Sequence, residues 1–147
     1  MKIVTIIALS TFIFTTNVFA MCDDGSKTIF SCTTKKGKQI EVCDAGKTIS
    51  YSFGKLQANP EIVVKVPRSK ASTSQWAGIG RSESYSIDIP NGKTIYSVFW
   101  SLDRLSDEHP IDAGVSVSNN DKLVATVNCS GKNIVNNIEG IALKPSE

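Results

Sequence analysis

Apolar and polar residues alternate along most of the chain after residue 26, which is the period of a β-strand with one buried face. Turn signals such as Asn91-Gly92 and Asn119-Asn120-Asp121 separate eight stretches of this kind. The predicted strands cover residues 27–33, 39–43, 47–53, 61–66, 84–89, 94–102, 114–118 and 122–129. Short strands at this spacing predict an all-β fold, a small antiparallel β-barrel or sandwich of about eight strands.

Two stretches depart from simple alternation. Residues 61–66 are almost continuously apolar, so we expect that strand to be buried on both faces. Residues 133–141 carry apolar side chains at a spacing that allows a short helical turn, although a strand competes there. Neither a linker nor a packed repeat divides the chain, so a single all-β domain is predicted over residues 21–147.

The first 20 residues have the pattern of a secretory signal peptide. Lys2 gives a positive start, residues 3–14 are almost entirely apolar, and Val18-Phe19-Ala20 fits a cleavage site after Ala20. The run is shorter than the roughly 20 residues that a membrane span needs. Because Met21 rather than a small residue precedes Cys22, a lipid anchor is not expected. We therefore predict a periplasmic or secreted protein with no membrane attachment after cleavage.

The four cysteines are expected to form two disulfides, because an even number in an exported chain favours a disulfide framework. Three pairings are open. A hairpin around Lys35-Lys36-Gly37 would place Cys43 opposite the start of the first strand, near Cys22. The favoured pairing is therefore Cys22 with Cys43 and Cys32 with Cys129. The cysteines lack C-x2-C spacing and the one histidine lies far from them, so we expect no metal and no cofactor.

The charge is nearly balanced but unevenly placed. Residues 21–147 hold 15 Lys and Arg against 14 Asp and Glu, too little excess for a nucleic-acid-binding protein. Residues 27–81 carry a net +7, whereas residues 82–147 carry a net −4. Antiparallel strands that interleave the two segments would cancel this field. The alternative is two faces of opposite charge, one of which could steer a charged partner.

Catalytic motifs are missing from the sequence. The chain has neither the G-x-S-x-G turn of a serine hydrolase nor a complete phosphate-binding loop. The only histidine, His109, follows Asp107 and Glu108 in a polar loop that ends at Pro110. We therefore predict that the protein is not an enzyme. A hydrolase of wall polymers that uses His109 and the nearby acids is the less favoured alternative.

Three polar segments are candidate recognition loops. Residues 67–86 combine a tryptophan with arginines, serines and glycines, a composition typical of binding surfaces. In this loop Trp76 is either a binding anchor or a plug in the mouth of the barrel. The other two candidates are residues 91–96 and the acidic loop 103–112. The predicted partner-contacting residues are Trp76, Arg81, Asn91, Lys93, Tyr96, Asp103, Asp107 and Glu108.

Three features of the chain carry a resemblance to a known family. They are Phe30-Ser31-Cys32 in the first strand, the late Cys129, and the segment Asn91-Gly92-Lys93-Thr94-Ile95-Tyr96. The chain resembles the small periplasmic lysozyme inhibitors of Gram-negative bacteria and, more broadly, other small exported β-proteins of proteobacteria. The resemblance implies a compact antiparallel barrel with a disulfide between an early and a late cysteine. It also implies a Ser-Gly-x-x-Tyr loop that enters the cleft of a lysozyme. Here Asn91 replaces the serine and one extra residue precedes Tyr96.

The expected function is accordingly that of an exported binding protein, an inhibitor or immunity protein against a cell-wall-lytic enzyme. Lysozymes are usually cationic, so the acidic residues Asp103, Asp107, Glu108 and Asp112 would form the complementary face. The second hypothesis is a structural or adhesive β-module of the cell envelope. It predicts self-association, or a strand left unpaired at a sheet edge. The sequence does not set the oligomeric state.

Overall fold

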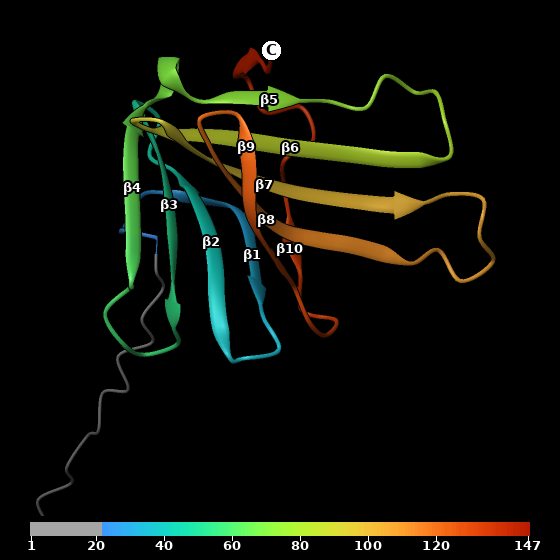
Figure 1. Ribbon diagram of the computed structural model, residues 1–147, viewed down its shortest axis with the longest axis horizontal. Helices are drawn as coiled ribbons and strands as arrows, with labels where there is room; N and C mark the ends of the chain where they lie inside the picture. The colour runs from blue at the N-terminus through green and yellow to red at the C-terminus, as the bar shows by residue number, and fades with distance from the viewer. Residues whose placement is uncertain (1–21) are drawn as a thin grey trace, which may run out of the picture.

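The computed structural model describes residues 22–147, so the predicted signal peptide lies outside the described residues. It is an all-β fold of two sheets, five-stranded and six-stranded, which are not closed into a barrel. In Figure 1, β6, β7 and β8 run at a steep angle across β1 to β4. The prediction of an all-β fold is confirmed, in its sandwich form. No helix among the described residues is long and apolar enough to cross a membrane.

Four consecutive antiparallel strands make up most of the five-stranded sheet. Its strand order is β10-β1-β2-β3-β4, so only the short β10 comes from elsewhere in the chain. The strands are β1 (Lys27–Thr33), β2 (Lys38–Asp44), β3 (Thr48–Lys55), β4 (Ile62–Pro67) and β10 (Val135–Asn136).

A short 3-10 helix, η1 (Arg68–Lys70), leads from β4 into the six-stranded sheet, whose order is β11-β5-β6-β7-β8-β9. Its pairings are antiparallel, except that β11 runs parallel to β5. The strands are β5 (Ser72–Ser74), β6 (Ser82–Asn91), β7 (Thr94–Asp103), β8 (Ile111–Asn119), β9 (Lys122–Asn128) and β11 (Lys144–Pro145).

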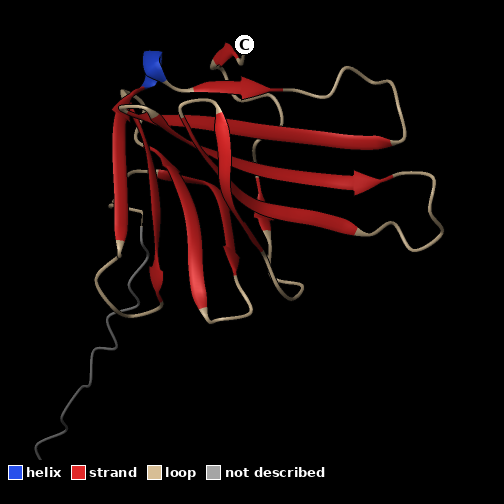
Figure 2. Cartoon of the chain, in the orientation of Figure 1, coloured by secondary structure: helices blue, strands red, loops and turns tan. Residues whose placement is uncertain are grey.

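All eight predicted strands are present, and the strands that alternation missed are β5, β10 and β11 (Figure 2). The expectation that residues 61–66 are buried on both faces is wrong. Val64 is buried, whereas Val63 is 62% exposed, because β4 packs only one of its faces on the core. Residues 133–141 contain β10 and a turn rather than a helical turn, since β10 pairs with β1.

The core lies between the sheets and is built from their inward-facing residues. In the five-stranded sheet, Phe30, Val42, Tyr51 and Val64 lie in one register row and are all buried. The six-stranded sheet contributes Ile87, Ile89, Val98 and Val115, and the C-terminal segment adds Ile138.

The two disulfides pair as predicted. Cys22 is bonded to Cys43, and Cys32 is bonded to Cys129. The first bond holds the N-terminal segment against β2. The second joins β1 to the residue that follows β9, and so ties the two sheets together covalently.

The expectation that strands interleave the basic and acidic segments is wrong. Strands β1 to β4 all lie in one sheet, and β6 to β9 all lie in the other. The chain forms β1 to β4 of the five-stranded sheet before it enters the six-stranded sheet. Most of residues 27–81 therefore lie in one sheet and most of residues 82–147 in the other, although β5 and Arg81 of the first segment belong to the six-stranded side.

Candidate functional site

One end of the six-stranded sheet projects beyond the other sheet and carries two long loops. Strands β6, β7 and β8 reach this end together on the right of Figure 1. The β5–β6 loop, residues 75–81, and the β7–β8 loop, residues 104–110, lie next to each other because Ser82 pairs with Asp103 in the β6–β7 register. We call these two loops, together with Asp103, the tip.

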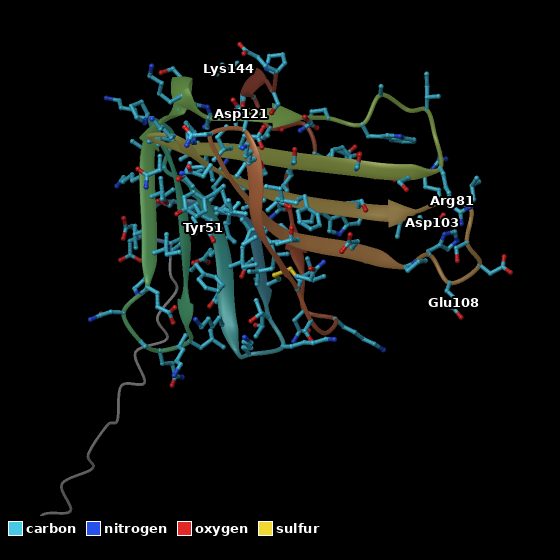
Figure 3. The ribbon with its side chains drawn as sticks, in the orientation of Figure 1. Tyr51, Arg81, Asp103, Glu108, Asp121 and Lys144 are labelled. Carbon is cyan, nitrogen blue, oxygen red and sulfur yellow. A yellow bond between two sulfur atoms is a disulfide. The ribbon has the colours of Figure 1, made fainter. Side chains whose placement is uncertain are left out.

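An ion pair and a backbone bond join the two loops at their base. The Arg81 Nε and Nη2 atoms lie 2.8 and 2.7 Å from Asp103 Oδ2, a pair that Figure 3 shows at this end of the sheet. The backbone N–H of Arg104 also donates to the carbonyl oxygen of Arg81 at 3.0 Å. Two of the predicted partner-contacting residues, Arg81 and Asp103, therefore contact each other.

Asp103 organises the β7–β8 loop as well as the ion pair. Its Oδ1 accepts hydrogen bonds from the backbone N–H groups of Leu105 at 3.0 Å and Ser106 at 3.2 Å. The hydrogen bond from Arg81 is the main cause that lowers the pKa of Asp103, and the Leu105 and Ser106 amides add to it. The carboxylate is thus engaged within the tip, and its contact with a partner stays a prediction.

Trp76 packs the β5–β6 loop against the β7–β8 loop. Its ring is half-buried and packs against the edge of the core, while the Arg104 guanidinium carbon lies 4.6 Å from the ring centroid. The indole Nε1–H donates to the carbonyl oxygen of Ile79 at 2.9 Å. Trp76 therefore fixes the conformation of its own loop, and its role as a binding anchor stays a prediction.

The most exposed apolar side chains of the tip are aliphatic. Ile79 is 83% exposed and Leu105 is 72% exposed. Ile79 stands between Gly78 and Gly80, whose φ values of 82° and 101° lie in the region that favours glycine. Sequence reasoning missed both residues, although an isoleucine between two glycines in a polar loop is a detectable signal.

The remaining acidic residues of the tip face solvent. Asp107 and Glu108 are exposed, and neither forms an ion pair with another described residue. Figure 3 shows Glu108 on the β7–β8 loop, near the labelled Arg81 and Asp103. The contact of Asp107 and Glu108 with a partner stays a prediction.

His109 closes the same loop in a conformation that is unusual for a residue with a side chain, with φ of 45°. Its Nδ1 lies 3.0 Å from the Asp103 carbonyl oxygen. His109 and Glu108 line a hollow of about 700 Å³ together with Trp100. None of the residues that line this hollow offers a hydroxyl or free thiol as a nucleophile.

The structure does not bring Asn91, Lys93 and Tyr96 to the tip. Asn91 and Lys93 belong to the β6–β7 turn, at the opposite ends of these two ten-residue strands. The expectation that Tyr96 contacts a partner is wrong, because strand alternation turns it inward. Its ring stacks on Tyr51 with centroids 4.8 Å apart.

Cys22, Glu41 and Cys43 are the one set of neighbouring side chains among residues 22–147 with the composition of a metal site. Both cysteines are consumed by their disulfide, so they offer no thiolate for a metal. No protein-family model matches the chain, and no curated protein or solved structure is detectably similar to it.

Proposed function

We propose that the protein is an exported, non-catalytic binding protein whose tip docks on a basic cell-wall-lytic enzyme, as an inhibitor or an immunity protein. The observation that carries this proposal is the joining of the two loops by Arg81–Asp103 and Arg104–Trp76. The joined loops present Ile79 and Leu105 to solvent.

The physical case rests on preorganisation. Loops that are already fixed lose little conformational entropy on binding, so more of the contact energy becomes affinity. Ile79 and Leu105 supply an apolar centre that a cleft could enclose, and polar groups surround them, as in protein interfaces. Asp107 and Glu108 would attract a basic partner and would speed its approach. Two disulfides are also typical of exported proteins.

The direct test measures peptidoglycan lysis by several types of lysozyme with and without a molar excess of the mature protein, residues 21–147. The proposal predicts a lower rate of lysis for at least one type, with saturable inhibition. Unchanged rates across all types, together with no binding to these enzymes by calorimetry, would remove lytic enzymes as the partner class.

A free edge of the six-stranded sheet favours a structural envelope module as the second candidate. β9 pairs only with β8, and its Leu123 and Val124 are exposed. Edge strands of this kind can add a strand from another chain. Light scattering at increasing concentration separates the two functions. A monomer favours the binding protein, whereas an oligomer that the double variant L123K/V124K dissociates favours the module.

A further inference from the structure

Glu41 is a buried carboxylic acid on the outer face of the five-stranded sheet. Its neighbours along β2, Ile40 and Val42, face the core, so alternation turns Glu41 to the other side. Outward-facing residues of such a sheet are usually solvated, yet Glu41 is only 4% exposed. In the register it lies between Ser31 of β1 and Ser52 of β3.

The N-terminal segment is held against this face of the sheet. The disulfide fixes Cys22 to Cys43, and the Thr28 hydroxyl donates to the Cys22 sulfur at 3.4 Å. A turn closed by the bond from Ser26 N–H to the Asp23 carbonyl oxygen, at 2.9 Å, precedes β1. One carboxylate oxygen of Glu41 and the sulfur atoms of Cys22 and Cys43 lie within 4.8 Å of one another.

The carboxyl group of Glu41 lacks a partner. Its Oε2 atom is buried without a hydrogen bond to any described residue, which is rare for a buried polar atom. A hollow of about 450 Å³ is lined by Cys43 and by Ser52, the β3 residue opposite Glu41, and carries the charged groups Asp23 and Lys65. Both are exposed, and neither forms an ion pair with Glu41. Desolvation raises the pKa of Glu41 to about 7.

A cationic donor would complete this site, and the sequence predicts one at the residue that precedes Cys22. Hydrolysis of the Ala20–Met21 peptide bond by a signal peptidase would release the carboxylate of Ala20 and free the amino group of Met21. That amino group is mostly protonated at neutral pH, since its ordinary pKa is about 7.7–8.0. Consecutive Cα atoms are about 3.8 Å apart, so it stays close to the fixed Cys22.

We propose that Glu41 is the binding site for the α-ammonium group that signal-peptide cleavage creates at Met21. The proposal rests on the export that the proposed function assumes, but it is independent of the tip. In the uncleaved chain the same nitrogen is an uncharged amide, so Glu41 has no counter-ion. Cleavage would therefore add an ion pair that stabilises only the mature protein.

The sign of the pH effect distinguishes the two states. Without a counter-ion, the pKa of about 7 exceeds the ordinary value of 4.5. The unfolded chain then loses its proton first, so folding stability declines as the pH rises from 4.5 to about 7. With the ammonium group in place, the charged carboxylate is favoured, the pKa of Glu41 is lowered and this decline becomes smaller.

The experiment compares four oxidised proteins. One is the mature chain that begins at Met21, another carries two additional alanines before Met21, and each is also made with Glu41→Gln. The readouts are the Glu41 carboxyl titration by 13C NMR and the thermal midpoint at pH 5 and pH 7. We expect the pKa of Glu41 to lie well below 7 in the mature chain and near 7 in the extended chain. The extended chain should melt lower at pH 7, and Glu41→Gln should remove that difference.

The proposal is overturned by a Glu41 titration near 7 in both chains. It is also overturned if the extension lowers the thermal midpoint equally with and without the Glu41→Gln substitution, or if mass spectrometry shows that the exported chain begins at another residue. If Glu41→Gln does not fold, the NMR titration of the two chains that keep Glu41 decides alone. If these tests fail but the protein inhibits a lysozyme, the proposed function still stands. If the protein is not exported, both proposals fail, because both assume export.

Discussion

Arg104 lies over the indole ring of Trp76, with its guanidinium carbon 4.6 Å from the ring centroid. Trp76 belongs to the β5–β6 loop and Arg104 to the β7–β8 loop, so this contact joins segments that are 28 residues apart in the sequence. The Arg81–Asp103 ion pair joins the same two loops at their base. The tip should therefore behave as one unit rather than as two independent loops.

Asp103→Ala tests whether the two loops of the tip behave as one unit. The substitution removes the acceptor for Arg81 and for the N–H groups of Leu105 and Ser106. We expect faster hydrogen exchange in both loops and little change in the thermal midpoint, because the tip projects beyond the core. Asp107→Ala, at an exposed residue without an ion pair, is the matched control. Unchanged exchange in the β5–β6 loop would show that the loops are independent.

Arg68→Ala should destabilise the fold through a different ion pair. Arg68 Nη1 lies 2.6 and 2.7 Å from the two carboxylate oxygens of Asp44, and Arg68 Nε donates to the Ala142 carbonyl oxygen at 3.2 Å. Because the Asp44 side chain is only 13% exposed, we expect a loss of about 1–3 kcal/mol in the free energy of unfolding, measured in urea at pH 7. Lys47→Ala, in the exposed β2–β3 turn, should have almost no effect.

The effect of Arg68→Ala should depend on pH. Burial opposes the ionisation of Asp44, but the hydrogen bonds from Arg68 and the Gly46 amide, together with nearby positive charge, outweigh it and lower its pKa below 3.8. A lowered pKa stabilises the fold above the ordinary value, and this stability is lost as the pH falls through the lowered value. The difference in the free energy of unfolding between wild type and Arg68→Ala should therefore become smaller below pH 3.8. A constant difference down to pH 2 would contradict the assignment to Asp44.

Gly114→Ala tests the close approach of β8 and β9. A Cβ atom added at Gly114 would overlap the carbonyl oxygen of Val127, a backbone atom that cannot rotate away. We expect a loss of about 1–3 kcal/mol in the free energy of unfolding, since one strand must shift. Ser116→Ala on the same strand should be nearly neutral. Equal stability of the two variants would mean that β9 is free to move.

The disulfides should contribute unequally to stability. Cys32 and Cys129 are 97 residues apart, whereas Cys22 and Cys43 are 21 apart. In the chain-entropy account, removal of the long bridge costs about 4–5 kcal/mol and removal of the short one about 3 kcal/mol. Urea unfolding of the paired Cys→Ala variants measures both values. A greater loss from the short bridge would indicate that its contacts around Glu41 matter more than chain entropy.

Strand alternation predicted seven of the eight long strands because half-buried strands show a period of two, and β4 was predicted from its continuous apolar run. The disulfide pairing followed from one hairpin, since a register that sets Cys43 beside the start of β1 leaves Cys32 for Cys129. Strands of two or three residues, such as β5 and β11, show no period and were missed, whereas β10 lies where the sequence left a strand as one alternative.

The tip was only half predictable. The sequence predicted a polar loop with a tryptophan and a second, acidic loop. Their contact depends on the β6–β7 register, which places Ser82 opposite Asp103. The inward turn of Tyr96 depends on the same register, which sets it opposite the buried Ile89. The exposure of Ile79 and Leu105 depends on loop geometry that no periodic pattern encodes.

The central claim is that the tip binds the partner, and a comparison of dissociation constants by calorimetry tests it most directly. The titrations use the lysozyme type that wild type inhibits, with I79D and L105D as tip variants and L56D as the control. Leu56 is also exposed but lies in the β3–β4 loop of the other sheet. The account predicts that each tip variant binds roughly tenfold more weakly or worse, while L56D binds like wild type. Wild-type affinity in both folded tip variants would contradict it.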